Sequence, residues 1–215
     1  MTTVEHPLIA DRLTYLRSKD SSSQEFRTIL HNIATLMVPE VTASLATTPC
    51  LVETPMEKTD GRRITMPVVL SPILRAGLAL AEGFLTVIPD AIVAHIGIRR
   101  DDSTLKPEVY YPNPSVDFAN SNTIVLDPML ATGGSAMMAL GVLRQAGVRD
   151  ERVVFANVVS CPEGLRRLAS EAPDVKIVTC AVDAGLNDQK FIVPGLGDFG
   201  DRYFGTFGYA EGLWG

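Results

Sequence analysis

The sequence predicts an α/β fold, in which a mostly parallel β-sheet is flanked by helices. Short apolar runs rich in β-branched residues recur along the chain, at residues 67–74, 91–98, 123–126, 153–159 and 175–182. Strands of a parallel sheet are buried on both faces and have this composition. Helix-like stretches separate the runs, at residues 76–86, 134–146 and 163–171. Strands and helices that alternate in this way are typical of a parallel sheet that binds its ligand at the carboxyl ends of the strands.

An N-terminal helix is expected before the sheet, at residues 24–38. Its apolar side chains recur at the intervals of one helix face, at Phe26, Ile29, Leu30, Ile33 and Met37. The serines at residues 21–23 supply N-cap candidates, and Pro39 is expected to end the helix. Residues 50–66 are polar and mixed, and the pair Asp60-Gly61 predicts a turn within them.

A polar interval at residues 100–122 is the longest connection inside the alternating pattern. It holds Lys106, Tyr110 and three prolines. Connections of this length in a compact fold are usually functional or mobile, so we expect a flexible loop here. The 215 residues suit a single domain that spans the whole chain, 1–215.

The composition excludes several classes of protein. With 46% hydrophobic and 20% charged residues, the chain is typical of globular proteins. A net charge of −6 argues against nucleic-acid and membrane-surface partners, which favour clustered Lys and Arg. Neither a secretory signal nor a run of about 18 apolar residues is present, so we expect a cytoplasmic protein. The cysteines and histidines form no ligand motif, so we predict no metal site built from protein ligands.

The strongest local signal is a buried strand that ends in Asp127, followed by a small-residue loop that opens a helix. Backbone amides of such a loop, together with the helix N-terminus, can hold a phosphate. Gly133 and Gly134 let the backbone approach a ligand closely. Thr132 and Ser135 add hydroxyl donors, and the Asp127 carboxylate can accept hydrogen bonds from a ribose diol. An ordinary turn between a strand and a helix fits the same residues equally well.

Two common nucleotide motifs are not met. No Gly-Lys-Ser/Thr completes a Walker loop after Asp127. Residues 195–200 match the dinucleotide pattern G-x-G-x-x-G, but only 15 residues follow Gly200. A dinucleotide site needs a helix and then a strand with an acidic residue about 20 positions on. The segment is therefore either a plain glycine-rich tail or a rigid loop whose backbone faces a flat, polar ligand.

Two arginine positions follow predicted strands, Arg75 and the pair Arg99-Arg100. Taken alone, each fits either a solvated charge or a group that binds an anion. Together with the loop after Asp127, they give three strand ends that can bind phosphate at one edge of a parallel sheet. This convergence indicates a ligand with several phosphate groups.

These segments resemble the uracil phosphoribosyltransferases, a type I phosphoribosyltransferase family. Residues 127–135 (DPMLATGGS) resemble its loop for phosphoribosyl pyrophosphate (PRPP), residues 72–77 (PILRAG) its pyrophosphate-side loop, and residues 194–206 (PGLGDFGDRYFGT) its uracil-binding segment. Shorter similarities lie in register at residues 5–8, 162–164 and 183–187. The resemblance implies the type I fold, with a C-terminal base-binding hood at about residues 187–206. It also implies transfer of the 5-phosphoribosyl group of PRPP to uracil, giving UMP and pyrophosphate in pyrimidine salvage.

The resemblance further implies a role for each matching residue. The implied catalytic residues are Asp198, Arg100 and Asp127. The implied contacts to PRPP are Arg75, Arg100, Asp127, Pro128, Met129, Leu130, Ala131, Thr132, Gly133, Gly134, Ser135 and Asp198. The implied contacts to uracil are Ile192, Gly197, Asp198 and Phe199, largely through backbone groups. Arg100 would stand at the base of the flexible loop, which carries Tyr110 and closes over the substrate.

The implied cofactor is Mg²⁺, bound mainly through PRPP, and the implied assembly is a homo-oligomer of two or more chains. GTP is a candidate allosteric activator, which the sequence leaves open. Two other functions stay open: a regulatory homologue that binds PRPP or UMP and acts through RNA, and a phosphoribosyltransferase for another base. The acidic balance counts against the first. Phe199 keeps the second open, because many relatives carry a smaller residue there. The sequence assigns no role to the tail at residues 207–215.

Overall fold

The computed structural model describes residues 1–100, 107–111 and 116–206, with the backbone alone at residues 99–100 and 107–111. Its described part holds a nine-stranded sheet with the main order β1-β11-β10-β8-β4-β6-β7, while β5 pairs with β4 and β9 with β10. The strands are β1 (Thr2–Thr3), β4 (Val68–Leu74), β5 (Ile92–Val93), β6 (Ile96–Arg100), β7 (Pro107–Tyr111), β8 (Asn122–Leu126), β9 (Met129–Leu130), β10 (Val153–Ser160) and β11 (Lys176–Val182). The predicted α/β fold with a mostly parallel sheet is confirmed, since only β6 and β7 pair antiparallel within this described sheet.

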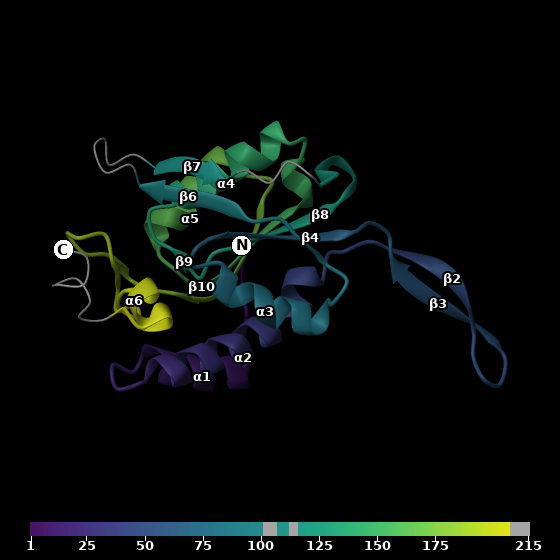
Figure 1. The fold of residues 1–215 in the computed structure, drawn as a ribbon, viewed down its shortest axis with the longest axis horizontal. Coiled ribbons are helices and arrows are strands. Elements are labelled where there is room, and N and C mark those ends of the chain that lie inside the picture. Colours follow the sequence, from purple (N-terminus) through teal and green to yellow (C-terminus); the bar gives the residue numbers. More distant parts are fainter. Residues whose placement is uncertain (101–106, 112–115, 207–215) are drawn as a thin grey trace.

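Helices cover both faces of the sheet (Figure 1). On one face lie α1 (Pro7–Arg17), α2 (Ser23–Thr42) and α3 (Leu78–Val87), and on the other lie α4 (Gly134–Gln145) and α5 (Pro162–Glu171). Successive strand residues alternate between the two cores, because Leu70 packs with the first group of helices and Val69 with the second. Both residues are fully buried, which explains why the central strands are apolar without interruption.

The N-terminal region is more helical than expected. Ser22 caps α2 and forms a capping box with Glu25, as the serine run predicts. The expectation that Pro39 ends the helix is wrong, because α2 continues through Pro39 to Thr42. Val38 and Val41 are buried on either side of the proline, and their burial offsets the hydrogen bond that the proline cannot donate. The preceding helix α1 was not predicted from periodicity.

The polar segment before β4 is a β-hairpin arm, formed by β2 (Thr47–Glu53) and β3 (Lys58–Ile64), that projects from the body of the molecule (Figure 1). The predicted turn at Asp60-Gly61 is wrong, because both residues lie within β3. The turn lies at Thr54, whose hydroxyl accepts a hydrogen bond from the Glu57 amide at 3.0 Å. Gly61 instead makes room for the opposite strand, since a Cβ there would lie 2.6 Å from Val52 Cγ2.

Within the interval at residues 100–122, the described residues include regular structure. Its residues 107–111 form β7, which pairs antiparallel with β6. A single 3₁₀ turn, η1 (Phe118–Asn120), follows and buries Phe118. Parts of the expected flexible loop, residues 101–106 and 112–115, lie outside the described residues, as does the tail at 207–215.

The last elements of the described chain form a hood at the carboxyl end of the sheet. A two-stranded ribbon, β12 (Gly185–Leu186) and β13 (Ile192–Val193), leads to the short helix α6 (Phe199–Phe204). In Figure 1, α6 lies beside the end of the sheet, on the side of α1 and α2. Among the helices of the described chain, none has both the length and the apolar character needed to cross a membrane.

Candidate active site

The candidate site is a cavity of about 410 Å³ at the carboxyl ends of β4 and β8. The two strands are parallel neighbours with Pro72 opposite Leu126, so the loops that follow them meet at one edge of the sheet. The hood closes the far side. The cavity is lined by Ile73, Leu74, Arg75, Ala76, Ile98, Asp127, Met129, Ala131, Ser135, Lys190, Phe191, Ile192, Gly197, Asp198, Phe199 and Gly200.

A smaller cavity of about 150 Å³, which we call the cradle, opens at the loop before α4. It is lined by Asp127, Met129, Leu130, Ala131, Thr132, Gly133, Gly134, Ser135, Ala136 and Lys190. Gly133 has a φ of 75°, a conformation that side chains disfavour, and α4 begins at Gly134. The Thr132 and Ser135 side chains are exposed, so their hydroxyls are accessible beside the helix N-terminus. This arrangement suits a phosphate.

Asp127 lies where the cradle and the larger cavity meet. Burial raises the pKa of its carboxyl to about 7, and a hydrogen bond from the Met129 amide opposes the rise only in part. A carboxyl with this pKa loses its proton readily when a cation or a hydrogen-bond donor arrives. Perturbed groups of this kind concentrate in functional clefts.

Arg75 follows β4 in a loop that packs tightly on the end of β8. A Cβ at Gly77 would lie 2.2 Å from the Leu126 carbonyl oxygen, so only glycine allows this contact. The Leu74–Arg75 peptide bond is cis. The exposed Arg75 guanidinium carbon lies 5.2 Å from the centre of the Phe204 ring, which comes from the last turn of α6. A cation–π contact therefore joins this loop to the hood.

The hood is fixed to α1 by a partly buried charge network. The Arg17 guanidinium donates to both oxygens of Asp183, each at 2.7 Å, and to the Gly195 carbonyl at 2.8 Å. Asp183 also accepts a hydrogen bond from the Gly195 amide at 2.8 Å. Burial alone would raise the pKa of Asp183, but Arg17 and the Gly195 amide hold it below its usual value. Both backbone groups of Gly195 are thereby held in one orientation.

A second arginine holds α6. The buried Arg202 guanidinium donates to the carbonyl oxygens of Leu16 and Leu196, both at 2.8 Å, and lies 4.5 Å from the Phe26 ring centre. At the start of α6, Asp198 is the N-cap and accepts a hydrogen bond from the Asp201 amide at 2.8 Å. The Asp198 side chain is thus oriented at the cavity wall by its own helix.

Phe199 contributes mainly to packing. Its ring stacks on Tyr203 at 5.7 Å and meets Phe26 edge-on at 5.6 Å. Only 6% of the residue is exposed, although it lines the cavity. A large side chain at this position is therefore accommodated in the core between α2 and α6, and its backbone stays at the cavity wall.

Most residues predicted from the sequence meet in these two cavities. Pro128 lines neither of them, and its carbonyl instead accepts hydrogen bonds from the Val158 and Val159 amides. Arg100 ends β6 and Tyr110 lies in β7, but their side chains are outside the described part of the chain. Lys190, which lines both cavities, was missed, and its only signal is a lysine in the polar turn before Ile192.

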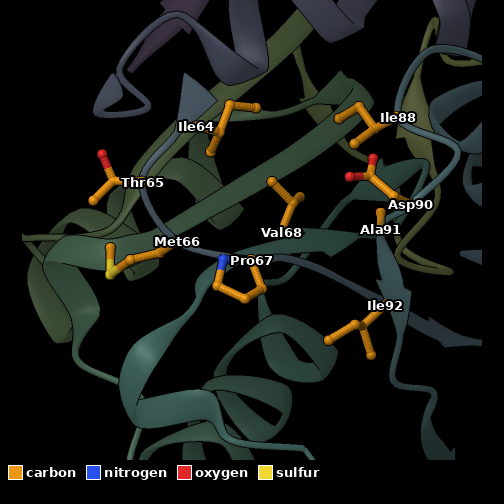
Figure 2. A pocket seen from close by; sticks show the side chains of 9 residues that line it. All are labelled: Ile64, Thr65, Met66, Pro67, Val68, Ile88, Asp90, Ala91 and Ile92. Atoms are coloured by element: carbon orange, nitrogen blue, oxygen red, sulfur yellow. The ribbon is translucent and has the colours of Figure 1, made fainter. Parts of the chain in front are cut away.

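A further cavity of about 440 Å³ lies at the amino-terminal end of β4, away from this site. Figure 2 shows that its walls are mainly aliphatic, with the Asp90 carboxylate and the Thr65 hydroxyl as polar side-chain groups. Its lining residues are Ile64, Thr65, Met66, Pro67, Val68, Ile88, Asp90, Ala91 and Ile92. This lining offers neither a phosphate cradle nor paired catalytic groups, so the cavity beneath the hood is the candidate active site.

Comparisons with known proteins agree with this geometry. The family model for uracil phosphoribosyltransferase matches residues 3–206. A uracil phosphoribosyltransferase of Dictyoglomus thermophilum is 47% identical over 204 residues, which cover 94% of this chain and 98% of that relative. A uracil phosphoribosyltransferase of Finegoldia magna is 47% identical over 207 residues, with 96% and 98% covered.

Solved structures agree on the fold. A structure of a protein from Aquifex aeolicus superposes with a TM-score of 0.87 and 33% identity, over 94% of this chain and 97% of that chain. A purine phosphoribosyltransferase from Pyrococcus horikoshii has a TM-score of 0.50 and 13% identity, over 73% of this chain and 84% of that chain. The second similarity concerns the fold alone.

Proposed function

The chain belongs to the uracil phosphoribosyltransferase family, and we propose that it transfers the 5-phosphoribosyl group of PRPP to uracil, giving UMP and pyrophosphate. One structural observation supports this proposal most strongly. The two cavities form one continuous space, because they share Asp127, Met129, Ala131, Ser135 and Lys190. This space is bordered by the cradle, by the loop that carries Arg75 and by the hood. A substrate with phosphates at both ends of a ribose, and a flat base beside it, fits such a space.

We assign the ends of PRPP by the groups that face each part of the space. The 5-phosphate would bind the cradle, where amides and the hydroxyls of Thr132 and Ser135 are available. The ribose hydroxyls would bind Asp127, and the pyrophosphate would bind Arg75. Arg100 is assigned to PRPP as well, on the family resemblance alone.

Uracil would lie against the hood. Its carbonyl and N–H groups alternate around the ring, and exposed backbone groups can match that pattern. Ile192 supplies an apolar wall, and Gly197, Asp198 and Phe199 follow one another along the cavity edge. The network of Arg17 and Asp183 holds Gly195, two residues before Gly197. The base subsite would thus be formed in advance of substrate binding.

The chemistry would depend on position and charge. Displacement of pyrophosphate from C1 of the ribose develops positive charge on the sugar and negative charge on the leaving group. Arg75 would stabilise the leaving group, and the side chains of Asp127 and Asp198 line the cavity in which the sugar would bind. No side chain needs to form a covalent bond, because uracil and C1 would be held close together.

The site also suits Mg²⁺ bound mainly through PRPP. Among the described residues, no three His, Cys, Asp or Glu side chains converge to hold a metal by themselves. Asp127 and Asp198 nevertheless place two carboxylates in the cavity, and carboxylate and phosphate oxygens are the ligands that Mg²⁺ prefers. The ion would neutralise charge on the leaving pyrophosphate.

The test is a reaction with purified protein, uracil, PRPP and Mg²⁺, in which UMP and pyrophosphate are quantified by chromatography. We expect equal amounts of both products and none when any one component is left out. Adenine and hypoxanthine serve as control bases. Conversion of a control base in place of uracil would contradict the proposal, and so would PRPP binding without any product.

Regulation and assembly belong to the same proposal. GTP activation, a homo-oligomer and a cytoplasmic role in pyrimidine salvage are expected from the family resemblance. Adding GTP to the reaction tests the first of these, and light scattering of the purified protein tests the second. An unchanged rate over a range of GTP concentrations would remove GTP from the proposal without affecting the reaction.

A further inference from the structure

The cradle has an unbalanced charge. Its neutral donors are backbone amides and the hydroxyls of Thr132 and Ser135. Asp127 lines the same space and is its acidic side chain. A sugar 5-phosphate carries a charge of about −1.5 to −2 at neutral pH. A phosphate bound beside an acidic side chain is stabilised by a cation at the wall of the cradle.

Lys190 is the cationic side chain among the residues that line the cradle. It also lines the larger cavity, so it stands where the two spaces join. The residue is exposed, and its ammonium makes no hydrogen bond to the part of the chain that the structure describes. Arg167 lies nearby, but it does not line the cradle and its guanidinium pairs with Glu171 at 2.9 Å.

The backbone of Lys190 has an unfavourable conformation. Its φ is 68°, a left-handed conformation that is uncommon for a residue with a side chain. The turn is closed by hydrogen bonds from the Lys190 amide to the Asn187 carbonyl and from the Phe191 amide to the Asn187 side chain, both at 2.9 Å. Glycine would fit the same φ without strain. A lysine at this position therefore contributes its side chain and not its backbone.

We propose that Lys190 binds the 5-phosphate of PRPP and of UMP. The proposal rests on the function proposed above. The hood turn at residues 187–190 would bring the ammonium over the cradle, opposite the amides of Gly133 and Gly134. Lysine then supplies the charge, whereas the loop amides and hydroxyls supply the directional hydrogen bonds. The base-binding hood thereby also contributes to phosphate binding.

Glycine provides a matched test, because Lys190→Gly removes the ammonium and also relieves the strained φ. We expect its affinity for UMP, measured by calorimetry, to fall about tenfold or more, since hydrogen bonds to charged groups contribute at least that much. Its KM for PRPP should rise by a similar factor while kcat stays near that of the wild type. The melting temperature should not fall, and Lys190→Arg should keep UMP affinity within about threefold.

Several outcomes separate the possibilities. The UMP affinity of wild-type protein should weaken with salt more steeply than that of Lys190→Gly. Wild-type UMP affinity in Lys190→Gly at low salt would overturn the assignment, provided that the wild-type protein makes UMP. Weaker inhibition by pyrophosphate with unchanged UMP affinity would overturn it as well, because Lys190 would then serve the leaving group. Wild-type protein that neither makes nor binds UMP would overturn the proposed function, and this inference with it.

Discussion

Asp127 allows a quantitative test of the site that needs no substrate. Burial raises the pKa of its carboxyl from 3.8 to about 7 in the folded protein. Between these two values the folded chain binds a proton that the unfolded chain has released, so stability falls as pH rises. The loss begins near pH 4 and is complete above about pH 7. At about 1.4 kcal/mol per pKa unit, ionised Asp127 costs the folded state on the order of 4 kcal/mol.

Replacement of Asp127 with Asn keeps the shape of the side chain and removes its charge. We expect the free energy of unfolding of the Asp127→Asn variant to exceed that of the wild type by about 3 kcal/mol more at pH 8 than at pH 5. The comparison across pH cancels any effect of the substitution that does not depend on pH. Urea denaturation of both proteins, without ligands and at several pH values, gives the difference directly.

Parallel pH profiles for the two proteins would refute this reasoning, because Asp127 would then titrate as an ordinary exposed carboxyl. A profile that differs as expected would show that the fold retains a destabilising group at the site. Such a group is explained by function when the same substitution also abolishes UMP formation. The wild-type protein should then gain stability from PRPP and Mg²⁺ that the variant does not gain.

Three further substitutions test other parts of the site. Asp198→Asn should lower kcat by at least about tenfold, and its melting temperature should change little because Asn also caps a helix. Wild-type turnover in this variant would remove Asp198 from the site. Gly133→Val should abolish PRPP binding in a titration, since Gly133 has a φ of 75° and a Cβ there would lie 3.1 Å from Leu168 Cδ1. Circular dichroism checks that the variant folds, and undiminished PRPP affinity would contradict the assignment of the cradle to phosphate. Phe204→Ala should raise the inhibition constant for pyrophosphate about threefold through the loss of its contact with Arg75, and Phe204→Tyr should restore the wild-type constant. Equal inhibition constants in the wild type and both variants would show that the contact contributes nothing to binding.

The sequence predicts the central strands well because their signal is local. Val69 and Leu70 point to opposite faces and both are buried, so the composition of β4 alone identifies it. Pro39 and Gly61 misled the prediction for the opposite reason. Each follows a strong local rule that tertiary contacts override, burial of Val38 and Val41 in one case and the close approach of Val52 in the other.

The candidate site likewise has one part that is local in sequence and another that only the fold brings together. The cradle is contiguous in sequence, so a single glycine-rich loop after Asp127 reveals it. Lys190 lies 55 residues beyond Ser135, and only the path of the hood brings it to the cradle. Arg17 is separated by 166 residues from its partner Asp183, and no local pattern connects them. Interactions of this kind depend on the fold as a whole and cannot be read from spacing.

In the hood, the short helix α6 extends from the wall of the candidate site to the loop that carries Arg75. Asp198 caps the start of α6 at the cavity wall where we propose that uracil binds, and Phe204 lies at the end of α6 against Arg75. Arg202 fixes the middle of the same helix to the backbone of α1, so α6 has little freedom to move by itself. A displacement of the base segment must therefore change the support of Arg75 as well. Under the proposed function, the preformed base subsite and the binding of the leaving pyrophosphate would therefore depend on the same helix.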